Sequence, residues 1–188
     1  MLPGEVVAEN NVRETTIDVR AAREKILYYE GEPRFEMKFI RRAVADDKNL
    51  QLVALQRTAD NKYLRLDIDN ADELVGGFPK TREELFGYRA LVLGSVEAGA
   101  FTGDQLRMIA EFVDKRGGGL LVLGGGRSFA QGGWAGTPVA DALPVVIERA
   151  PGGEPPLMRL KVAPTREGAE HAVTQIAATP AASITRWT

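Results

Sequence analysis

The chain alternates short, continuous apolar runs with segments of helical periodicity. Runs of this kind are typical of strands that are buried on both faces of a parallel sheet. The sequence predicts a strand in each of them, namely Ile26–Tyr29, Leu50–Leu55, Ala90–Leu93 and Leu120–Leu123. Strands separated by helices in this way indicate a doubly wound α/β fold, with a mostly parallel sheet and right-handed crossovers.

Helical segments lie between these runs. Pro33 suits the first turn of a helix over residues 33–46. The apolar residues that recur there at helical spacing are Phe35, Phe39, Ile40, Ala43 and Val44. Two capping boxes, Thr81–Glu84 and Thr102–Gln105, predict the starts of two further helices, and Gly117–Gly119 ends the second one.

Other segments fit this repetition less well. Residues 5–19 predict two strands around a turn at Asn10–Asn11. We therefore assign residues 1–22 to a short N-terminal β segment and residues 23–188 to the α/β domain, which we expect to be truncated at its C-terminus. Residues 56–80 form a long polar insertion, of a kind that is usually functional or mobile. Further short strands are predicted at Val145–Glu148 and Leu157–Val162.

The composition is that of an ordinary globular protein, and it excludes several kinds of site. Of the 188 residues, 44% are hydrophobic, and the net charge of −2 gives no attraction to nucleic acid. The absence of cysteine excludes disulfides, thiolate metal sites and a cysteine nucleophile. The single histidine, His171, excludes a histidine-rich metal site. No apolar stretch is long enough to span a bilayer, so we expect no direct membrane insertion by this segment.

Polar and flexible residues follow three of the predicted strands. In open parallel sheets, ligands bind outside the carboxyl ends of the strands. The three loops at these ends are Glu30–Arg34, Gly94–Glu97 and Gly124–Ser128. We therefore predict a ligand-binding crevice that is built from Glu30, Glu32, Arg34, Ser95, Glu97, Gly125, Gly126, Arg127 and Ser128.

The glycine-rich loop GGGRS, which follows the fourth predicted strand, has three interpretations. A phosphate-binding P-loop requires Lys before the Ser or Thr, where this chain has Arg. A nucleophile elbow requires a reactive side chain at the apex of the turn, and Gly125 and Gly126 have none. We favour the third interpretation, a plain glycine turn in which Arg127 caps carbonyls or pairs with Glu32 or Glu97.

Two other functions stay open at this point. A hydrolase would use a non-cysteine nucleophile or carboxylates of this crevice, such as Ser128 with Glu32 or Glu97, and the Ser128 hydroxyl would then lie about 3 Å from its base. A small-anion sensor would hold its ligand with Arg127 and the N–H groups of the glycines. The carboxylates near the start of the first helix are more often partners of the helix dipole than metal ligands, so we predict no metal and no cofactor.

Three stretches resemble the glutamine amidotransferase-like domain of large bacterial membrane proteins, which often also carry von Willebrand factor A-type or immunoglobulin-like regions. They are ILYYEGEPRFEMKFIRRAV, GFPKTREELFGYRALVLGSV and FTGDQLRMIAEFVDKRGGGLLVLGGGRSFAQGGWAGTPVADALPV. The resemblance covers roughly residues 24–175, and it implies the flavodoxin-like α/β fold of class I glutamine amidotransferases. Residues 5–20 resemble the last strands of an immunoglobulin-like domain.

In active members of this class, the turn after the corresponding strand holds the catalytic cysteine, and a His-x-Glu motif follows downstream. The cysteine position falls here on Gly125 or Gly126, and the residue two after His171 is Val173 instead of Glu. The resemblance therefore implies a non-catalytic domain. We expect a binding or assembly module on the extracytoplasmic (periplasmic) side of a membrane-anchored envelope protein. Its expected partner is an unidentified protein or another domain of the same protein, and not a nucleic acid.

Overall fold

The structure is a computed structural model that describes residues 14–17, 23–149 and 162–187. The chain forms two compact units that divide after Ala150. The β segment predicted at residues 1–22 lies mostly outside the described residues. Its described part, residues 14–17, is exposed and belongs to no strand, so the predicted strand is wrong over those four residues.

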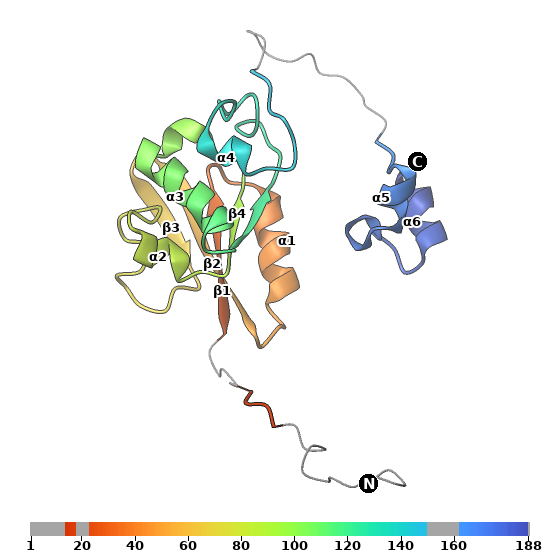
Figure 1. The fold of residues 1–188 in the computed structure, drawn as a ribbon, viewed down its shortest axis with the longest axis horizontal. Coiled ribbons are helices and arrows are strands. Elements are labelled where there is room, and N and C mark those ends of the chain that lie inside the picture. The colour runs from red at the N-terminus through yellow and green to blue at the C-terminus, as the bar shows by residue number, and fades with distance from the viewer. Residues whose placement is uncertain (1–13, 18–22, 150–161, 188) are drawn as a thin grey trace, which may run out of the picture. The chain divides into compact units, whose positions relative to one another are not determined.

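Five strands of the first unit form one mixed, mostly parallel sheet (Figure 1). They are β1 (Glu24–Glu30), β2 (Leu50–Ala59), β3 (Lys62–Leu66), β4 (Ala90–Leu93) and β5 (Gly119–Val122). The strand order is β3-β2-β1-β4-β5, in which β3 runs antiparallel to β2 and all other neighbours are parallel. The predicted α/β fold with a mostly parallel sheet is thus confirmed.

The strand β1 lies at the centre of the sheet and is buried along most of its length. Its register pairs Leu27 with Val53 of β2 and with Leu91 of β4. Leu27 and Tyr29 pack into the core on one face, Tyr28 packs into the core on the other, and all three are at most 1% exposed. A strand that is covered on both faces has no polar side, which explains why its sequence is a continuous apolar run.

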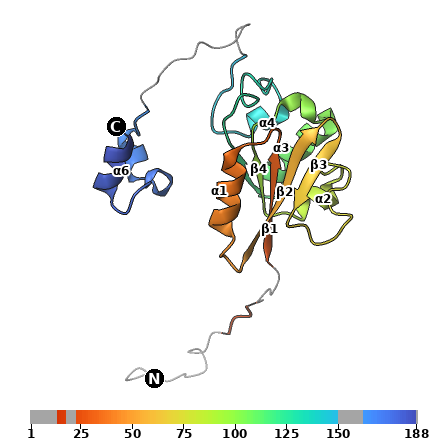
Figure 2. The same ribbon diagram turned by 180° about the vertical axis from the view of Figure 1, so that it is seen from behind.

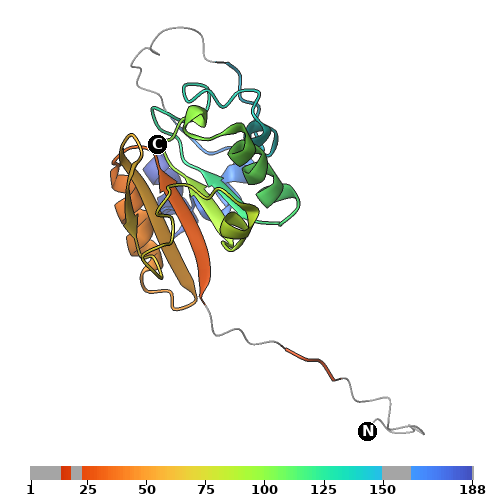
Figure 3. The ribbon, with the colours of Figure 1, turned by 90° about the vertical axis from the view of Figure 1, so that its left-hand side faces the viewer.

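Helices cover both faces of this sheet (Figures 1 and 3). The helix α1 (Phe35–Val44) packs on one face and is the one helix there within residues 23–149. The other face is covered by α2 (Arg82–Phe86), α3 (Gly103–Asp114) and α4 (Pro138–Asp141). A single turn of 3-10 helix, η2 (Ala98–Ala100), follows the loop after β4.

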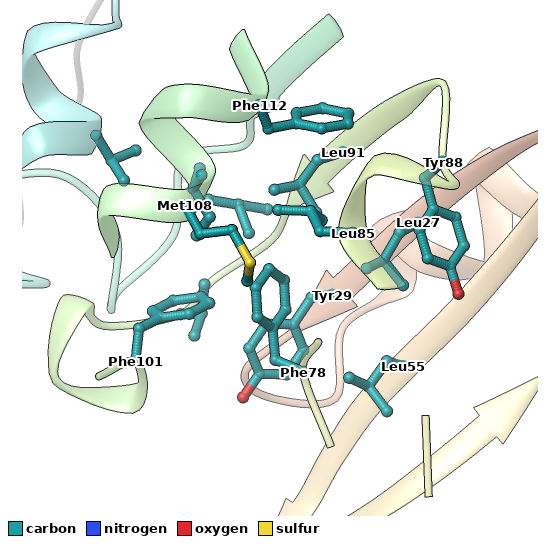
Figure 4. Close-up of a cluster of buried hydrophobic side chains, with 14 of the residues drawn as sticks. Leu27, Tyr29, Leu55, Phe78, Leu85, Tyr88, Leu91, Phe101, Met108 and Phe112 are labelled. Carbon is teal, nitrogen blue, oxygen red and sulfur yellow. The ribbon is translucent and has the colours of Figure 1, made fainter. Parts of the chain in front are cut away.

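The larger of the two core clusters lies between the sheet and α2 and α3 (Figure 4). Met108 and Phe112 of α3 pack there with Leu91 of β4. Near them, the rings of Tyr29 and Phe101 meet edge to face with their centroids 5.5 Å apart. This cluster holds most of the fully buried side chains of the first unit and fixes the position of α3 on the sheet.

The capping box predicted for α3 is present. The Thr102 hydroxyl accepts a hydrogen bond from the N–H of Gln105 at 3.2 Å, and the Gln105 side chain accepts one from the N–H of Thr102 at 2.9 Å. At the start of α2, the Thr81 hydroxyl accepts from the N–H of Glu84, but the Glu84 carboxylate binds the N–H of Lys80 instead of returning to Thr81. Both predicted helix starts are therefore confirmed. At α2, only one of the two hydrogen bonds of a capping box is formed.

The helix predicted over residues 33–46 is present as α1, and its apolar residues lie on two sides. Its buried face carries Met37, with Ile40 and Val44 packed against the same cluster. Phe35 and Phe39, which recur at the same helical spacing, are 77% and 61% exposed. Spacing alone did not identify the inward face, because two stripes of apolar residues satisfy it on opposite sides of this helix.

The predicted insertion at residues 56–80 is partly sheet. The strand β2 continues to Ala59 and pairs with β3 in a hairpin, whose turn holds Asn61 in the left-handed region at φ 57°. Only residues 67–80 remain as an irregular loop with turns. The strand predicted at Val145–Glu148 is absent, since the described backbone there has no regular structure.

The second unit is helical in its described part (Figure 2). It contains α5 (Arg166–Glu170), η3 (Ala172–Thr174) and α6 (Pro180–Trp187). The indole N–H of Trp187 donates to the carbonyl of Thr174 at 3.0 Å and ties α6 to η3. The strand predicted at Leu157–Val162 lies outside the described residues except for Val162, which is exposed and in no strand.

We expect the core on the α3 face to dominate the stability of the first unit. Ile109 is fully buried, so Ile109→Ala should lower the free energy of unfolding by about 2–5 kcal/mol through lost contacts and a residual cavity. The matched control is Val146→Ala, because Val146 is 93% exposed and its truncation should change stability by less than about 0.5 kcal/mol. Urea unfolding measures both, and equal effects of the two substitutions would contradict this packing.

Candidate functional site

The loops after β1, β4 and β5 meet at one end of the sheet. After β1, the chain forms β2 on one side of it and then returns to form β4 on the other side. The loops that leave β1 and β4 therefore diverge from neighbouring strands, and ligands of doubly wound sheets bind at such switch points. All nine residues of the predicted crevice lie in these loops or at their borders, and side-chain contacts join the three loops directly.

The carboxylate of Glu30 lies at the centre of this site and is fully buried. It accepts hydrogen bonds from the Tyr28 hydroxyl at 2.5 Å and from the Ser95 N–H at 2.7 Å. The guanidinium of Arg34 donates two more, from Nε at 3.2 Å and from Nη2 at 3.1 Å. Burial, followed by the hydrogen bond to Glu30, raises the pKa of Tyr28 well above its usual value, so its phenol stays a donor.

Arg34 extends this contact to the third loop. Its Nη1 donates to the carbonyl of Gly124, directly after the β5 end, at 2.7 Å. A carboxylate of α1, that of Glu36, approaches the same guanidinium only at 3.8 Å and is half exposed. Arg34 precedes α1 as its N-cap residue, so one side chain fixes the start of α1, the end of β1 and the end of β5 relative to one another.

A second contact between the loops runs through Ser95, which is fully buried. Its hydroxyl donates a short hydrogen bond to the Glu32 carboxylate and accepts one from the N–H of Arg127 at 3.1 Å. Gly125 lies against this serine, and a Cβ on Gly125 would lie 2.5 Å from Ser95 Oγ and 2.9 Å from Arg34 Nη1. No side chain fits at Gly125 while these contacts exist. A Cβ on Gly126, in contrast, would meet no atom within 4 Å.

Ion pairs close the outer side of the site. The Arg127 guanidinium lies 3.5 Å from the Glu32 carboxylate and 3.7 Å from that of Glu97, which confirms the pairing expected for a plain glycine turn. Arg57 binds Glu97 at 2.8 Å and also donates to the carbonyl of Gly31 at 3.2 Å. The hydrogen bond from Arg57 is the main cause that holds the pKa of the Glu97 carboxyl below its usual value. Two carboxylates beside Arg127 disfavour the binding of an anion there.

Sequence reasoning missed Arg57 as a member of the site. It lies in β2 after the apolar run that predicted the strand, where the strand continues into the hairpin with β3. One signal for Arg57 was available in the sequence. A charged residue soon after the apolar part of a parallel strand lies at the same end of the sheet as the candidate loops. The predicted strand ended at Leu55, so that signal was read as part of the insertion.

Ser128 is 1% exposed and its hydroxyl faces the main chain. It donates to the carbonyl of Leu123 at 2.9 Å and lies 3.3 Å from that of Gly94. Among the described residues, no carboxylate or imidazole hydrogen-bonds this hydroxyl. His171 belongs to the second unit, where its Nδ1 accepts from the N–H of Val173 at 3.2 Å. This geometry opposes a hydrolase that uses Ser128 as its nucleophile.

The described residues also contain no group of three or more acidic or histidine side chains placed to hold a metal ion. In the site, the carboxylates face guanidinium and hydroxyl groups that donate to them. Their negative charge is thereby compensated within the protein, so neither a metal ion nor a cofactor is needed to explain the arrangement.

A cavity of about 590 Å³ lies elsewhere, near the amino ends of β1 and β4. The loop 67–80, which sequence reasoning treated only as an insertion, forms much of its wall together with Tyr88. Within this wall, Glu73 accepts from Lys25 at 2.6 Å and from the Tyr88 hydroxyl at 2.7 Å. Leu74 adopts φ 57°, a conformation that is uncommon for a residue with a side chain.

Comparisons with family models, with curated proteins and with solved structures found no match to this chain. Within the described part of the chain, no helix is long and apolar enough to cross a membrane. The description of the site therefore depends on the geometry of its own residues.

We expect the buried pair of Glu30 and Arg34 to be essential for the fold. Glu30→Gln removes the buried negative charge and leaves the Arg34 guanidinium with only the half-exposed Glu36 carboxylate at 3.8 Å, which should lower the free energy of unfolding by about 3–5 kcal/mol. Tyr28→Phe deletes only one hydrogen-bond donor and should cost about 1 kcal/mol. Urea or thermal unfolding measures both.

The double variant Glu30→Gln, Arg34→Met is the internal control, because it also removes the uncompensated cation. It should recover part of the loss caused by Glu30→Gln alone. A Glu30→Gln protein as stable as Tyr28→Phe would contradict the role given to this pair.

The pair of Arg57 and Glu97 should contribute stability that depends on pH. The folded-state pKa of Glu97 lies below its usual value of 4.5, so the contribution is complete above that pH and is lost as the pH falls through the folded pKa. Glu97→Gln should therefore destabilise the protein by about 0.5–1 kcal/mol at pH 7, a small value because the carboxylate is one-third exposed. As the pH falls below the folded pKa of Glu97, the stabilities of wild type and variant should converge.

The measurement is the free energy of unfolding from urea titrations between about pH 3 and pH 8, with roughly one titration per pH unit. Glu36→Gln is the matched control, since Glu36 contacts Arg34 only at 3.8 Å. A Glu97→Gln effect that does not change with pH would show that the charge of this carboxylate plays no part.

Proposed function

We propose that this chain contains a non-catalytic, class I glutamine amidotransferase-like domain that acts as a binding or assembly module of a bacterial envelope protein. The proposal rests on which residues occupy the loop after β5. Active members of that class have a cysteine there, and this chain has Gly125 and Gly126. Gly125 has no room for a side chain while its present contacts exist, and a Cβ on Gly126 would meet no atom within 4 Å.

The strand order supports the flavodoxin-like part of this proposal. Without the antiparallel β3, the parallel strands follow the order β2-β1-β4-β5. In terms of parallel strands this is the order 2-1-3-4, with which the flavodoxin-like sheets begin. The order agrees with the fold implied by the resemblance of residues 24–175, and the proposal equates the glycine loop after β5 with the strand end where that class has its nucleophile.

The side chains of the crevice also support a role without catalysis. Substrate sites need polar groups that are oriented but available to a ligand. Here the carboxylates of Glu30, Glu32 and Glu97 are bonded to Arg34, Ser95 and Arg57, so the space at the switch point is filled by the protein's own contacts. A domain that keeps the fold and fills the crevice is suited to binding through its outer surfaces.

The cellular setting belongs to the proposal as well. The resemblance to domains of large membrane proteins places this chain on the extracytoplasmic side of a membrane, anchored by segments outside residues 1–188. Residues 1–22 would then be the end of a preceding immunoglobulin-like domain, and the partner would be another domain of the same protein or a separate envelope protein. The lack of cysteine is compatible with this location, since no thiol is exposed to oxidation.

The proposal predicts that the protein does not hydrolyse glutamine. Purified protein should release no ammonia above the buffer rate at millimolar glutamine, measured with a coupled glutamate dehydrogenase assay and with an active amidotransferase as positive control. A Gly126→Cys variant should be equally inactive, because the His-x-Glu motif that activates the cysteine in active members is not present: the residue two after His171 is Val173. Hydrolysis by the wild type that Ser128→Ala abolishes would overturn the proposal and restore the hydrolase alternative.

A further inference from the structure

The cavity near the amino ends of β1 and β4 has the size and the wall of a small-molecule site. Its volume is about 590 Å³, and ligand pockets are typically about 300–1,000 Å³ with mostly apolar walls. Leu74, Val75 and Phe78 of the loop 67–80 line it together with Tyr88. It lies at the opposite end of the parallel strands from the loops after β1, β4 and β5, so a ligand here would not compete with the contacts of that crevice.

The wall formed by the loop 67–80 is held in one shape by hydrogen bonds to its main chain. Arg65 of β3 donates from Nη1 to the carbonyl of Ala71 at 2.6 Å and to that of Glu73 at 2.9 Å. The side-chain amide of Gln105 in α3 donates to the carbonyl of Pro79 at 3.0 Å. These bonds anchor the loop to two different elements, so the cavity is formed before a ligand enters. A preformed site loses less conformational freedom on binding.

Two of the five charged side chains that line the cavity compensate each other. Lys25 binds the Glu73 carboxylate at 2.6 Å, and it also binds Asp69, which is outside the lining, at 2.8 Å. Glu73 accepts a further hydrogen bond from the Tyr88 hydroxyl at 2.7 Å. The ammonium of Lys25 lies 5.6 Å from the centre of the Tyr88 ring. Because these charges are already satisfied, Lys25 and Tyr88 offer a ligand their aliphatic stem and their ring.

The other three charged side chains of the lining leave an excess of negative charge. They are Asp72, Lys80 and Glu84, and none of them forms an ion pair with another described residue. One oxygen of Glu84 accepts a hydrogen bond from the N–H of Lys80 at 2.7 Å, which orients the carboxylate without neutralising it. Two carboxylates against one ammonium, beside an apolar wall, attract a cation more strongly than an anion.

We propose that this cavity binds a small organic amine, whose ammonium group faces the carboxylates of Asp72 and Glu84 and whose apolar body packs against Leu74, Val75 and Tyr88. Both parts of the ligand are needed. Charge alone would bind at any acidic surface, and the apolar wall alone would not distinguish an amine from an alcohol of the same shape.

This site goes beyond the proposed assembly role and does not depend on it. The lining shares no residue with the crevice after β1, β4 and β5. Glutamine hydrolysis, which tests the absence of catalysis, says nothing about amine binding, so the failure of one proposal leaves the other in place.

Three probes that share one apolar body and differ in charge test the proposal: phenethylamine, phenethyl alcohol and hydrocinnamate. Each is titrated into isotope-labelled protein at low ionic strength, and the amide signals are followed by heteronuclear NMR. Phenethylamine should bind with a dissociation constant on the order of 1 mM, because the affinity per non-hydrogen atom is limited. The alcohol should bind about five-fold more weakly, since it forms no ion pair, and hydrocinnamate more weakly still. The amides that shift should be those of residues 67–80 and Tyr88.

Substitutions of exposed lining residues separate the effect of charge from that of the apolar wall. Asp72→Asn and Glu84→Gln should each weaken the binding of phenethylamine by about two- to five-fold, the range of an exposed ion pair. Lys80→Gln removes the opposing cation and should strengthen it by a similar factor. None of the three should change the binding of phenethyl alcohol. Asp114→Asn is the matched control, because Asp114 is exposed at the end of α3 and outside the lining.

The outcomes that would overturn the proposal are distinct. No saturable binding of phenethylamine, or amide shifts only outside residues 67–80 and Tyr88, would reject the site. Equal binding of the three probes, or tightest binding of hydrocinnamate, would reject an amine as its ligand. Circular dichroism should show the variants folded like the wild type. Folded Asp72→Asn and Glu84→Gln proteins with the affinity of the wild type for phenethylamine would reject the role of the two carboxylates, and the proposal with it.

Discussion

The carboxylate of Glu30 holds together the end of the sheet at which β1, β4 and β5 terminate. It is fully buried, so it must receive hydrogen bonds from donors that are buried with it. Those donors come from three places: Tyr28 within β1, Arg34 at the start of α1 and the N–H of Ser95 after β4. Because Arg34 also binds the carbonyl of Gly124, one carboxylate fixes the ends of three parallel strands.

This constraint explains the small residues around the site. Gly94 lies so close to Glu30 that a Cβ there would be 2.4 Å from the carboxylate oxygen, and Gly125 is restricted in the same way by Ser95. Glycine is therefore required at positions 94 and 125 by the close approach of the main chain to polar and charged side chains. The outer arginines, Arg57 and Arg127, neutralise the remaining carboxylates. The switch point of the sheet is consequently a packed part of the protein.

Much of the fold could be predicted from the sequence because burial on both faces leaves a simple pattern. β1 and β4 are continuous apolar runs for that reason, and the convergence of three loops follows from their parallel direction. The inward face of α1 was not predictable from spacing alone, since Met37 is less conspicuous than Phe35 and Phe39 although it is the buried residue. The contacts of Glu30 were also out of reach, because they join residues that are distant in sequence.

The space taken by Ser95 beside Gly125 limits how this protein can change. A single substitution that brings a thiol to that position collides with the Ser95 hydroxyl and with the guanidinium of Arg34. Moving either group disturbs the carboxylates of Glu30 and Glu32, and with them the strand ends that they join. A side chain at Gly125 would therefore cost several linked contacts at the strand ends, whereas Gly126 is free of this restriction.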